Sequence, residues 1–366
     1  MIRPWVFIKS GSCLFQVYDD GIDTNNGLYV SNLEYDLSTD NQIFGRLQNS
    51  NNLEYVRFGL GVPIHSLINS SYSRYISDSP KLLRQVFAVK DSEILEVIDL
   101  VKSAKDIVHK SARICSEVSA DFLFLFDLLL KSGINVDSLG VEGSLLAGLT
   151  NQESDLDLVL YGENNYKIFL NFYNENNDWP ISIEPFHSSE FGRQTIYNAR
   201  KYYSPLSKKE MIFHESRKPT GFIKNAGIIR KFSIVGILDT EDSLRKEATE
   251  IFYLNQSFKF IDICTVRGII SSDKFSLFRP SFYGVDKCIS IYLPERISNE
   301  KLSHIKYIVD YLGNFYLHCK INERFECRAT IEEIIVDGKE TGQYRLNLNH
   351  WDDHIRNGYY LKTIID

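Results

Sequence analysis

One short segment, residues 154–160, constrains the fold of this chain more than any other. It reads Ser-Asp-Leu-Asp-Leu-Val-Leu, so carboxylates and leucines alternate. Successive side chains of a strand point to opposite faces, which puts Asp155 and Asp157 on one face and the leucines on the other. Leucines need burial, so the segment predicts a strand with the core behind it and two carboxylates together in front.

The spacing of the two aspartates suits a divalent cation. Side chains at i and i+2 of a strand are about 6.5 to 7 Å apart at Cα, so both carboxylates can share Mg²⁺ or Mn²⁺. Without a cation, two like charges this close are unfavourable. A lone D-x-D is more often a solvated pair on an edge strand, so the interpretation depends on the neighbouring sequence.

A Gly-Ser turn precedes the pair, and ten residues separate Ser144 from Asp155. Gly143 and Ser144 follow a short apolar segment and lead into residues 145–149, which can form a short helix. Such a turn offers backbone N–H groups and a hydroxyl to a triphosphate, and glycine lets phosphate approach the backbone. We therefore expect Gly143 and Ser144 to bind nucleotide, and Asp155 and Asp157 to bind the metal ion.

The ordered pair of motifs resembles the signature of the DNA polymerase beta superfamily of nucleotidyltransferases. VEGSLLAG at 141–148, SDLDLVLYG at 154–162 and HESRK at 214–218 resemble a family of predicted archaeal nucleotidyltransferases of uncharacterised substrate. Residues 278–283 and 313–316 resemble the same family more weakly. The likeness covers most of the chain from about residue 90, and implies a nucleotidyltransferase core with two metal-binding aspartates.

Two-metal nucleotidyl transfer usually needs a third carboxylate on a neighbouring strand to help activate the attacking hydroxyl. Asp239, after a predicted strand at 232–238, is the favoured candidate. Glu184, on a short extended segment, is the second, and absence of a third carboxylate is the remaining alternative. In that strand the position expected to face the pair is Ser233, which departs from the pattern and bears on activity rather than on fold.

Basic residues concentrate between positions 200 and 231. Nine basic side chains against two acidic ones give a local excess of +7 in a chain of net charge −7. Aromatic residues interleave with them, as in surfaces that bind phosphates and stack bases, although a solvated basic helix is the alternative. Within this stretch Arg217 and Lys218 are the expected triphosphate contacts. His214 is expected to be structural.

The length of 366 residues exceeds what one core usually holds, so we expect several domains. Residues 1–90 alternate short apolar runs with turns and predict a β-rich segment. Residues 91–255 predict an α/β, polymerase-beta-like core, with helices at about 91–115, 119–132, 165–174 and 189–201 and a hairpin at 222–238. Residues 256–366 predict a small barrel or sandwich from strands at about 259–266, 288–292, 307–311, 315–320, 326–335 and 344–348.

The remaining sequence features bear on the partners and the cellular location of the protein. A net charge of −7 argues against a general nucleic-acid coat protein. The cysteines lack metal-site spacing and follow no signal peptide, which favours reduced thiols in a cytoplasmic protein. No apolar run approaches the roughly 20 residues of a membrane span, so no membrane partner is expected. Metal-ligand residue types at 350–354 match no defined site and are interpreted as a loop.

These features predict the transfer of an NMP from an NTP to a hydroxyl or phosphate acceptor by two-metal catalysis. RNA or a tRNA end is one candidate acceptor, and a protein hydroxyl is another. The rival hypothesis is a catalytically degenerate nucleotidyltransferase fold that binds nucleotide as a sensor or interaction module. A missing third carboxylate favours the rival.

Overall fold

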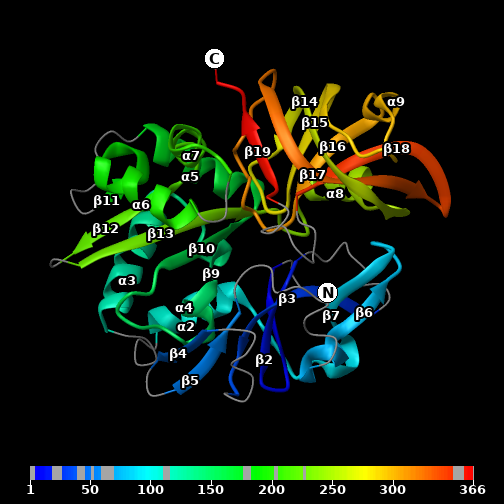
Figure 1. The fold of residues 1–366 in the computed structure, drawn as a ribbon. Coiled ribbons are helices and arrows are strands. Elements are labelled where there is room, and N and C mark those ends of the chain that lie inside the picture. Colours follow the sequence, from blue (N-terminus) through cyan, green and yellow to red (C-terminus); the bar gives the residue numbers. More distant parts are fainter. Residues whose placement is uncertain are drawn as a thin grey trace.

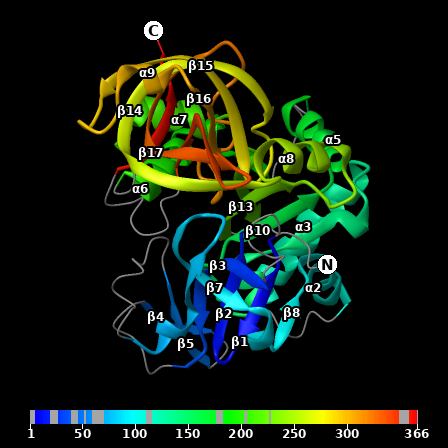
Figure 2. The same cartoon turned by 90° about the vertical axis from the view of Figure 1, so that its right-hand side faces the viewer.

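The computed structural model describes residues 5–18, 27–38, 46–50, 53–58, 70–109, 116–175, 183–201, 205–225, 228–348 and 358–365. Helices and strands are mixed, which confirms the α/β expectation in its coarse form. The strands form three sheets, and both views show the N-terminal sheet and the C-terminal sheet against the central one (Figures 1 and 2). No helix in the described ranges is long and apolar enough to cross a membrane.

The N-terminal sheet has the order β4-β5-β3-β2-β1-β8, with β7 on β3 and β6 on β7. The strands β1, β2, β3 and β7 bury most of their apolar side chains, Phe15, Val30 and Val86 among them. Their bounds are β1 (Phe7–Ser10), β2 (Cys13–Val17), β3 (Leu28–Asp36), β4 (Arg46–Ser50), β5 (Leu53–Arg57), β6 (Ile76–Ser79), β7 (Arg84–Lys90) and β8 (Glu96–Ile98).

This sheet extends beyond the predicted boundary at residue 90. Ile98 pairs with Phe7 of β1, so residues 96–98 form a strand. The helix predicted from Asp91 is therefore wrong in its first turns, and α2 spans Leu100–His109. Apolar steps of three and four over so few residues do not distinguish a helix from a short strand paired to a distant segment.

The central sheet has the order β11-β12-β13-β10-β9. Its strands are β9 (Leu139–Val141), β10 (Leu156–Tyr161), β11 (Ile183–Pro185), β12 (Thr220–Asn225) and β13 (Ile228–Ile237). β10 runs parallel to β13 and antiparallel to β9, and β12 and β13 are the antiparallel hairpin expected at 222–238. Leu156, Leu158 and Leu160 are buried, which confirms the predicted core face of β10.

Helices lie on both sides of the central sheet, with α2 and α3 below it and α5 above it in Figure 1. The further helices are α3 (Ser116–Lys131), α4 (Gly143–Ala147), α5 (Glu163–Glu175), α6 (Glu190–Arg200), α7 (Lys208–Glu215) and α8 (Ser243–Phe252). Ser189 accepts a hydrogen bond from Gly192 N and begins α6, as its N-cap. The helices expected at 119–132, 165–174 and 189–201 are thus present with small shifts of their ends.

The C-terminal strands are β14 (Gln256–Phe275), β15 (Ser281–Tyr292), β16 (Ile305–Asp310), β17 (Arg324–Val336), β18 (Lys339–Asn347) and β19 (Tyr360–Thr363), with a short α9 (Asn299–Leu302). β14 pairs with both β15 and β17, which closes the order β14-β15-β16-β18-β17 into a barrel, visible at the top of Figure 2. Register shifts along β14 provide the bending that closure needs. Of the two structures expected from the sequence, a barrel and a sandwich, the C-terminal strands form the barrel.

The strand predicted at 315–320 is wrong, because these residues form turns and bends. Their backbone N–H groups donate to side chains and not to a neighbouring strand. Phe315 N donates to Asp310 Oδ2 at 2.6 Å, and His318 N donates to the Tyr283 hydroxyl at 3.0 Å. The alternating apolar residues of this segment pack against the barrel as a loop.

Candidate functional site

The two aspartates lie where β10 meets β13. Asp157 is directly opposite Ser233 in the parallel ladder, and the Ser233 hydroxyl donates to Asp157 Oδ1 at 2.7 Å. Asp155 directly precedes β10, and its Oδ2 lies 3.3 Å from Lys231 Nζ. The structure thus brings the predicted pair together with a hydroxyl and an ammonium group, both from β13.

The charge on Asp157 is poorly compensated. Burial, and then the negative charge of Asp155, raise the pKa of Asp157 to about 6, although Lys231 and the Ser233 hydrogen bond act in the opposite direction. A cation near both carboxylates would favour their ionised form. The donor set therefore fits a hard divalent ion such as Mg²⁺.

The Gly-Ser turn lies directly beside the pair. Gly143 has φ +63°, and a Cβ on it would lie 3.1 Å from Asp157 Oδ2. The preceding residue, Glu142, donates its backbone N–H to the Asp157 carbonyl at 2.9 Å. Ser144 follows within the first turn of α4. Gly143, Ser144 and Asp157 are therefore neighbours, as the sequence predicts.

Neither candidate for the third carboxylate is brought to the pair. Asp239 lies beyond the end of β13, roughly 20 Å along the chain direction from Ser233 at about 3.3 Å per residue, and accepts from Thr240 N at 2.8 Å. Glu184 lies on β11, which β12 and β13 separate from β10, and it contacts Lys224 and Ser189. The register decides this: the position opposite Asp157 is Ser233.

No group of three or more His, Cys, Asp or Glu side chains within the described ranges is arranged to hold a metal ion. A metal ion at this site would thus depend on the two aspartates, with the remaining positions left to water and to phosphate oxygens. That arrangement is typical of Mg²⁺, which keeps several waters and is often bound through one or two carboxylates plus substrate phosphates.

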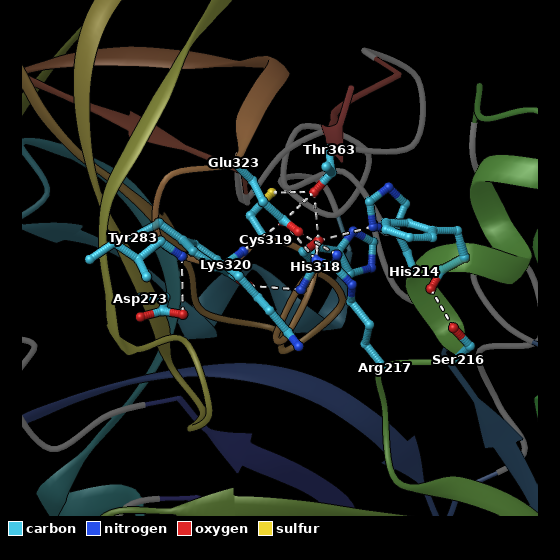
Figure 3. A network of polar contacts seen from close by, with 12 residues as sticks. His214, Ser216, Arg217, Asp273, Tyr283, His318, Cys319, Lys320, Glu323 and Thr363 are labelled. Carbon is cyan, nitrogen blue, oxygen red and sulfur yellow. Dashed lines mark hydrogen bonds and ion pairs between the residues drawn. The ribbon is translucent and has the colours of Figure 1, made fainter. Parts of the chain in front are cut away.

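The predicted triphosphate contacts, Arg217 and Lys218, are engaged elsewhere. Arg217 forms a bidentate ion pair with Glu323, with N–O distances of 2.8 and 2.5 Å, and also donates to the His318 carbonyl (Figure 3). Lys218 is buried and donates to Glu215 at 2.8 Å. Lys218 also donates to the Asn314 carbonyl at 2.7 Å, so both residues attach the end of α7 to the C-terminal part and the geometry does not support their predicted role. Their position in the sequence, close to the predicted site, did not indicate that they contact the C-terminal part in the folded chain.

His214 is structural, as expected. It is buried, and its ring stacks on that of His318 with a centroid distance of 4.5 Å and an interplanar angle of 10° (Figure 3). His214 Nδ1 lies 3.1 Å from the His318 carbonyl. Burial lowers the pKa of His214 to about 4, so the ring is neutral at physiological pH.

The N-terminal sheet supplies charged residues that the sequence did not indicate. Burial opposes the charge of Arg57, but Tyr35, Glu34, Asp155 and Asp157 outweigh it and raise the pKa of the guanidinium. Burial also raises the pKa of Glu34 to about 7. These residues lie about a hundred positions from the aspartates, and no local pattern marks them.

A buried ion pair joins the three parts of the chain next to the Gly-Ser turn. Arg279 donates to Glu142 at 3.1 and 2.7 Å, and its guanidinium lies 4.6 Å from the Trp5 ring. Gln16 Nε2 donates to Glu142 Oε2 at 3.2 Å. Glu142 is therefore occupied in positioning the N-terminal sheet and the barrel around the core.

The chain is similar in sequence to an archaeal protein. An uncharacterized protein of Methanocaldococcus jannaschii, MJ1086, is 26% identical over 212 residues, which are 57% of this chain and 54% of that protein. The chain thus matches about half the length of this relative. No protein-family model matches the chain, and no solved structure matches it.

Proposed function

We propose that this protein is a metal-dependent nucleotidyltransferase with a polymerase-beta-like core. The observation that carries the proposal is the contact between the turn and the pair: a Cβ at Gly143 would lie 3.1 Å from Asp157 Oδ2. A strand, this turn, a short helix and a second strand then present backbone N–H groups and two carboxylates at one place. The parallel strand β13 beside β10 fits the same kind of core.

In this proposal Asp155 and Asp157 hold Mg²⁺ or Mn²⁺, which neutralises phosphate charge when bound. Gly143 lets the Asp157 carboxylate lie close to the backbone of the turn, and the Ser144 hydroxyl can donate to a phosphate there. Lys231, which lies 3.3 Å from Asp155 Oδ2, would be able to donate to the phosphates if a cation took its place at that carboxylate. Catalysis then consists mainly of positioning and charge stabilisation, as in other phosphoryl transfers.

A second candidate is nucleotide binding without transfer. Ser233 favours it, because a hydroxyl stands opposite Asp157 where a third carboxylate would help to activate the acceptor. A serine can hold Asp157 in place but does not bind a second divalent ion as a carboxylate does.

One experiment separates the two candidates and identifies the acceptor. The purified protein is incubated with Mg²⁺ or Mn²⁺, each α-labelled NTP, and either total RNA or total protein. Label in RNA, at a tRNA end or on protein names the acceptor, provided that the Asp155→Asn, Asp157→Asn double variant transfers none. Saturable NTP binding without any transfer would replace the transferase proposal by the nucleotide-binding one.

A further inference from the structure

Arg57 of β5 lies among charged groups of the N-terminal sheet and the central sheet. It lies at the end of β5, opposite Tyr35 of β3, and its guanidinium is 6.0 Å from the Tyr35 ring. The charges of Asp155 and Asp157 act on it from the central sheet. Within the part of the chain that the structure describes, its side chain forms no hydrogen bond and no ion pair. Its N–H donors are thus available to a ligand beside the aspartates.

The Tyr35 hydroxyl is a second polar group in need of a partner. Tyr35 is only 1% exposed, and among the described residues its hydroxyl has no hydrogen-bond partner. The charges of Arg57 and Asp157 both act on it. A buried hydroxyl without a partner is costly, so a ligand that accepts its hydrogen bond would be stabilised.

Contacts on either side fix this part of the N-terminal sheet against the Gly-Ser turn. Gln16 of β2 donates to Glu142 at 3.2 Å, directly before Gly143. The Tyr55 hydroxyl, on the same strand as Arg57, is 3.5 Å from the Leu149 carbonyl after α4. These contacts place the strand that carries Arg57 beside the Gly-Ser turn.

We propose that Arg57, assisted by the Tyr35 hydroxyl, binds the phosphates of the nucleotide held at Asp155 and Asp157. A guanidinium presents donors in a planar fork that matches phosphate oxygens. A polyphosphate bound through a divalent ion on the aspartates would then have Arg57 as a second cationic partner. The N-terminal sheet is thus part of the nucleotide site. This inference rests on the proposed function and assigns to Arg57 the role that Arg217 and Lys218 do not fill.

The test measures binding of Mg²⁺ with inorganic tripolyphosphate, and of each Mg²⁺-NTP, by titration calorimetry on the full chain. Arg57→Gln should weaken tripolyphosphate binding at least tenfold, Arg57→Lys less, and Tyr35→Phe severalfold. Lys90→Gln is the matched control, because Lys90 is an exposed cation at the end of β7 in the same sheet. It should bind as the parent does.

A second readout has the opposite sign. Because Arg57 repels cations from the aspartates, Arg57→Gln should bind Mn²⁺ alone more tightly than the parent, while binding polyphosphate more weakly. A merely structural arginine would change neither affinity in this way. Thermal unfolding of each variant checks that the chain is folded, and Arg57→Lys serves if the glutamine variant is not.

The outcomes separate this inference from the proposed function. Parental polyphosphate affinity in Arg57→Gln, or unchanged Mn²⁺ affinity, overturns the role of Arg57 and leaves the aspartate site standing. If the parent binds neither tripolyphosphate nor any of the NTPs with Mg²⁺, both the inference and the proposed function are overturned.

Discussion

Asp157 carries an electrostatic penalty in the metal-free protein, and this penalty is measurable. Its pKa is raised from 3.8 to about 6 by burial and by Asp155. The folded state therefore resists ionisation: the penalty is fully present above about pH 6 and absent below about pH 3.8. A bound cation would remove the part of this penalty that comes from repulsion between Asp155 and Asp157.

Asp157→Asn should accordingly stabilise the metal-free protein at pH 8 by about 1–3 kcal/mol, at about 1.4 kcal/mol per pKa unit. It should have little effect at pH 4, where the parent carboxyl is largely protonated. Asparagine can still accept from Ser233. Urea denaturation at both pH values measures the difference, and equal effects at the two would contradict the electrostatic explanation. Stabilisation by Mg²⁺ with NTP should be lost in the same variant.

His214 makes the protein sensitive to acid. Burial lowers its pKa from 6.5 to about 4, so its contribution to stability is complete above about pH 6.5 and is lost as the pH falls through 4. His214→Gln should make the decline of the unfolding free energy across this range shallower by about 3 kcal/mol. His304→Gln, which changes an exposed histidine, is the control. Parallel pH profiles for both variants would exclude His214 as the cause.

At the scale of elements, the register between β10 and β13 determines what the site contains. The parallel ladder sets Ser233 opposite Asp157, while Asp239 falls beyond the strand. A shift of two residues along β13 would bring Lys231 or Val235 to that position. The content of the site therefore depends on how two strands far apart in sequence are aligned.

Ser233→Asp tests this alignment by placing a third carboxylate opposite Asp157. Without metal the variant should be less stable than the parent, because three like charges then share one place. With Mn²⁺ it should gain more stability than the parent does, measured as the shift of thermal unfolding with added metal. Ser233→Ala is the control and should lose only about 1 kcal/mol for one hydrogen bond. A metal response equal to that of the parent would show that position 233 does not face the pair.

At the scale of the molecule, buried and part-buried contacts join the three sheets. Trp5 Nε1 donates to the Arg279 carbonyl at 3.1 Å, and Arg84 of β7 pairs with Glu332 of β17 at 2.7 Å. A continuous apolar cluster runs from the N-terminal sheet through the core into the start of the barrel, including Phe258 and Phe282. We expect the three parts to unfold together.

Arg279→Gln tests this coupling. Removing one partner of a buried ion pair leaves Glu142 charged and uncompensated, which should cost about 3–5 kcal/mol. Tryptophan fluorescence and far-UV circular dichroism should still report one shared transition, at lower denaturant. Lys274→Gln, which removes an exposed ion pair with Glu247, should change stability by less than about 1 kcal/mol. Two separated transitions in the parent would contradict coupled unfolding.

Sequence alone determined the features that depend on neighbours along the chain. The alternation in β10, the glycine of the turn, the hairpin of β12 and β13 and several helices follow from periods and turn residues within a few positions. Asp155, Asp157, Gly143 and Ser144 were predicted together for that reason, and they are neighbours in the structure. Their proposed chemistry stays a prediction until the transfer experiment is done.

Only the tertiary structure decided which distant residues surround this pair. Ser233 rather than Asp239 faces Asp157 because of strand register, and the contacts of Gln16 and Tyr55 bring the N-terminal sheet against the Gly-Ser turn. Arg217 pairs with Glu323 and Lys218 pairs with Glu215, so both cations are engaged away from the aspartates. A local sequence pattern specifies the face of a strand on which a side chain lies. Which residues contact that face depends on the pairing of strands far apart in sequence and on the pairing of buried charges.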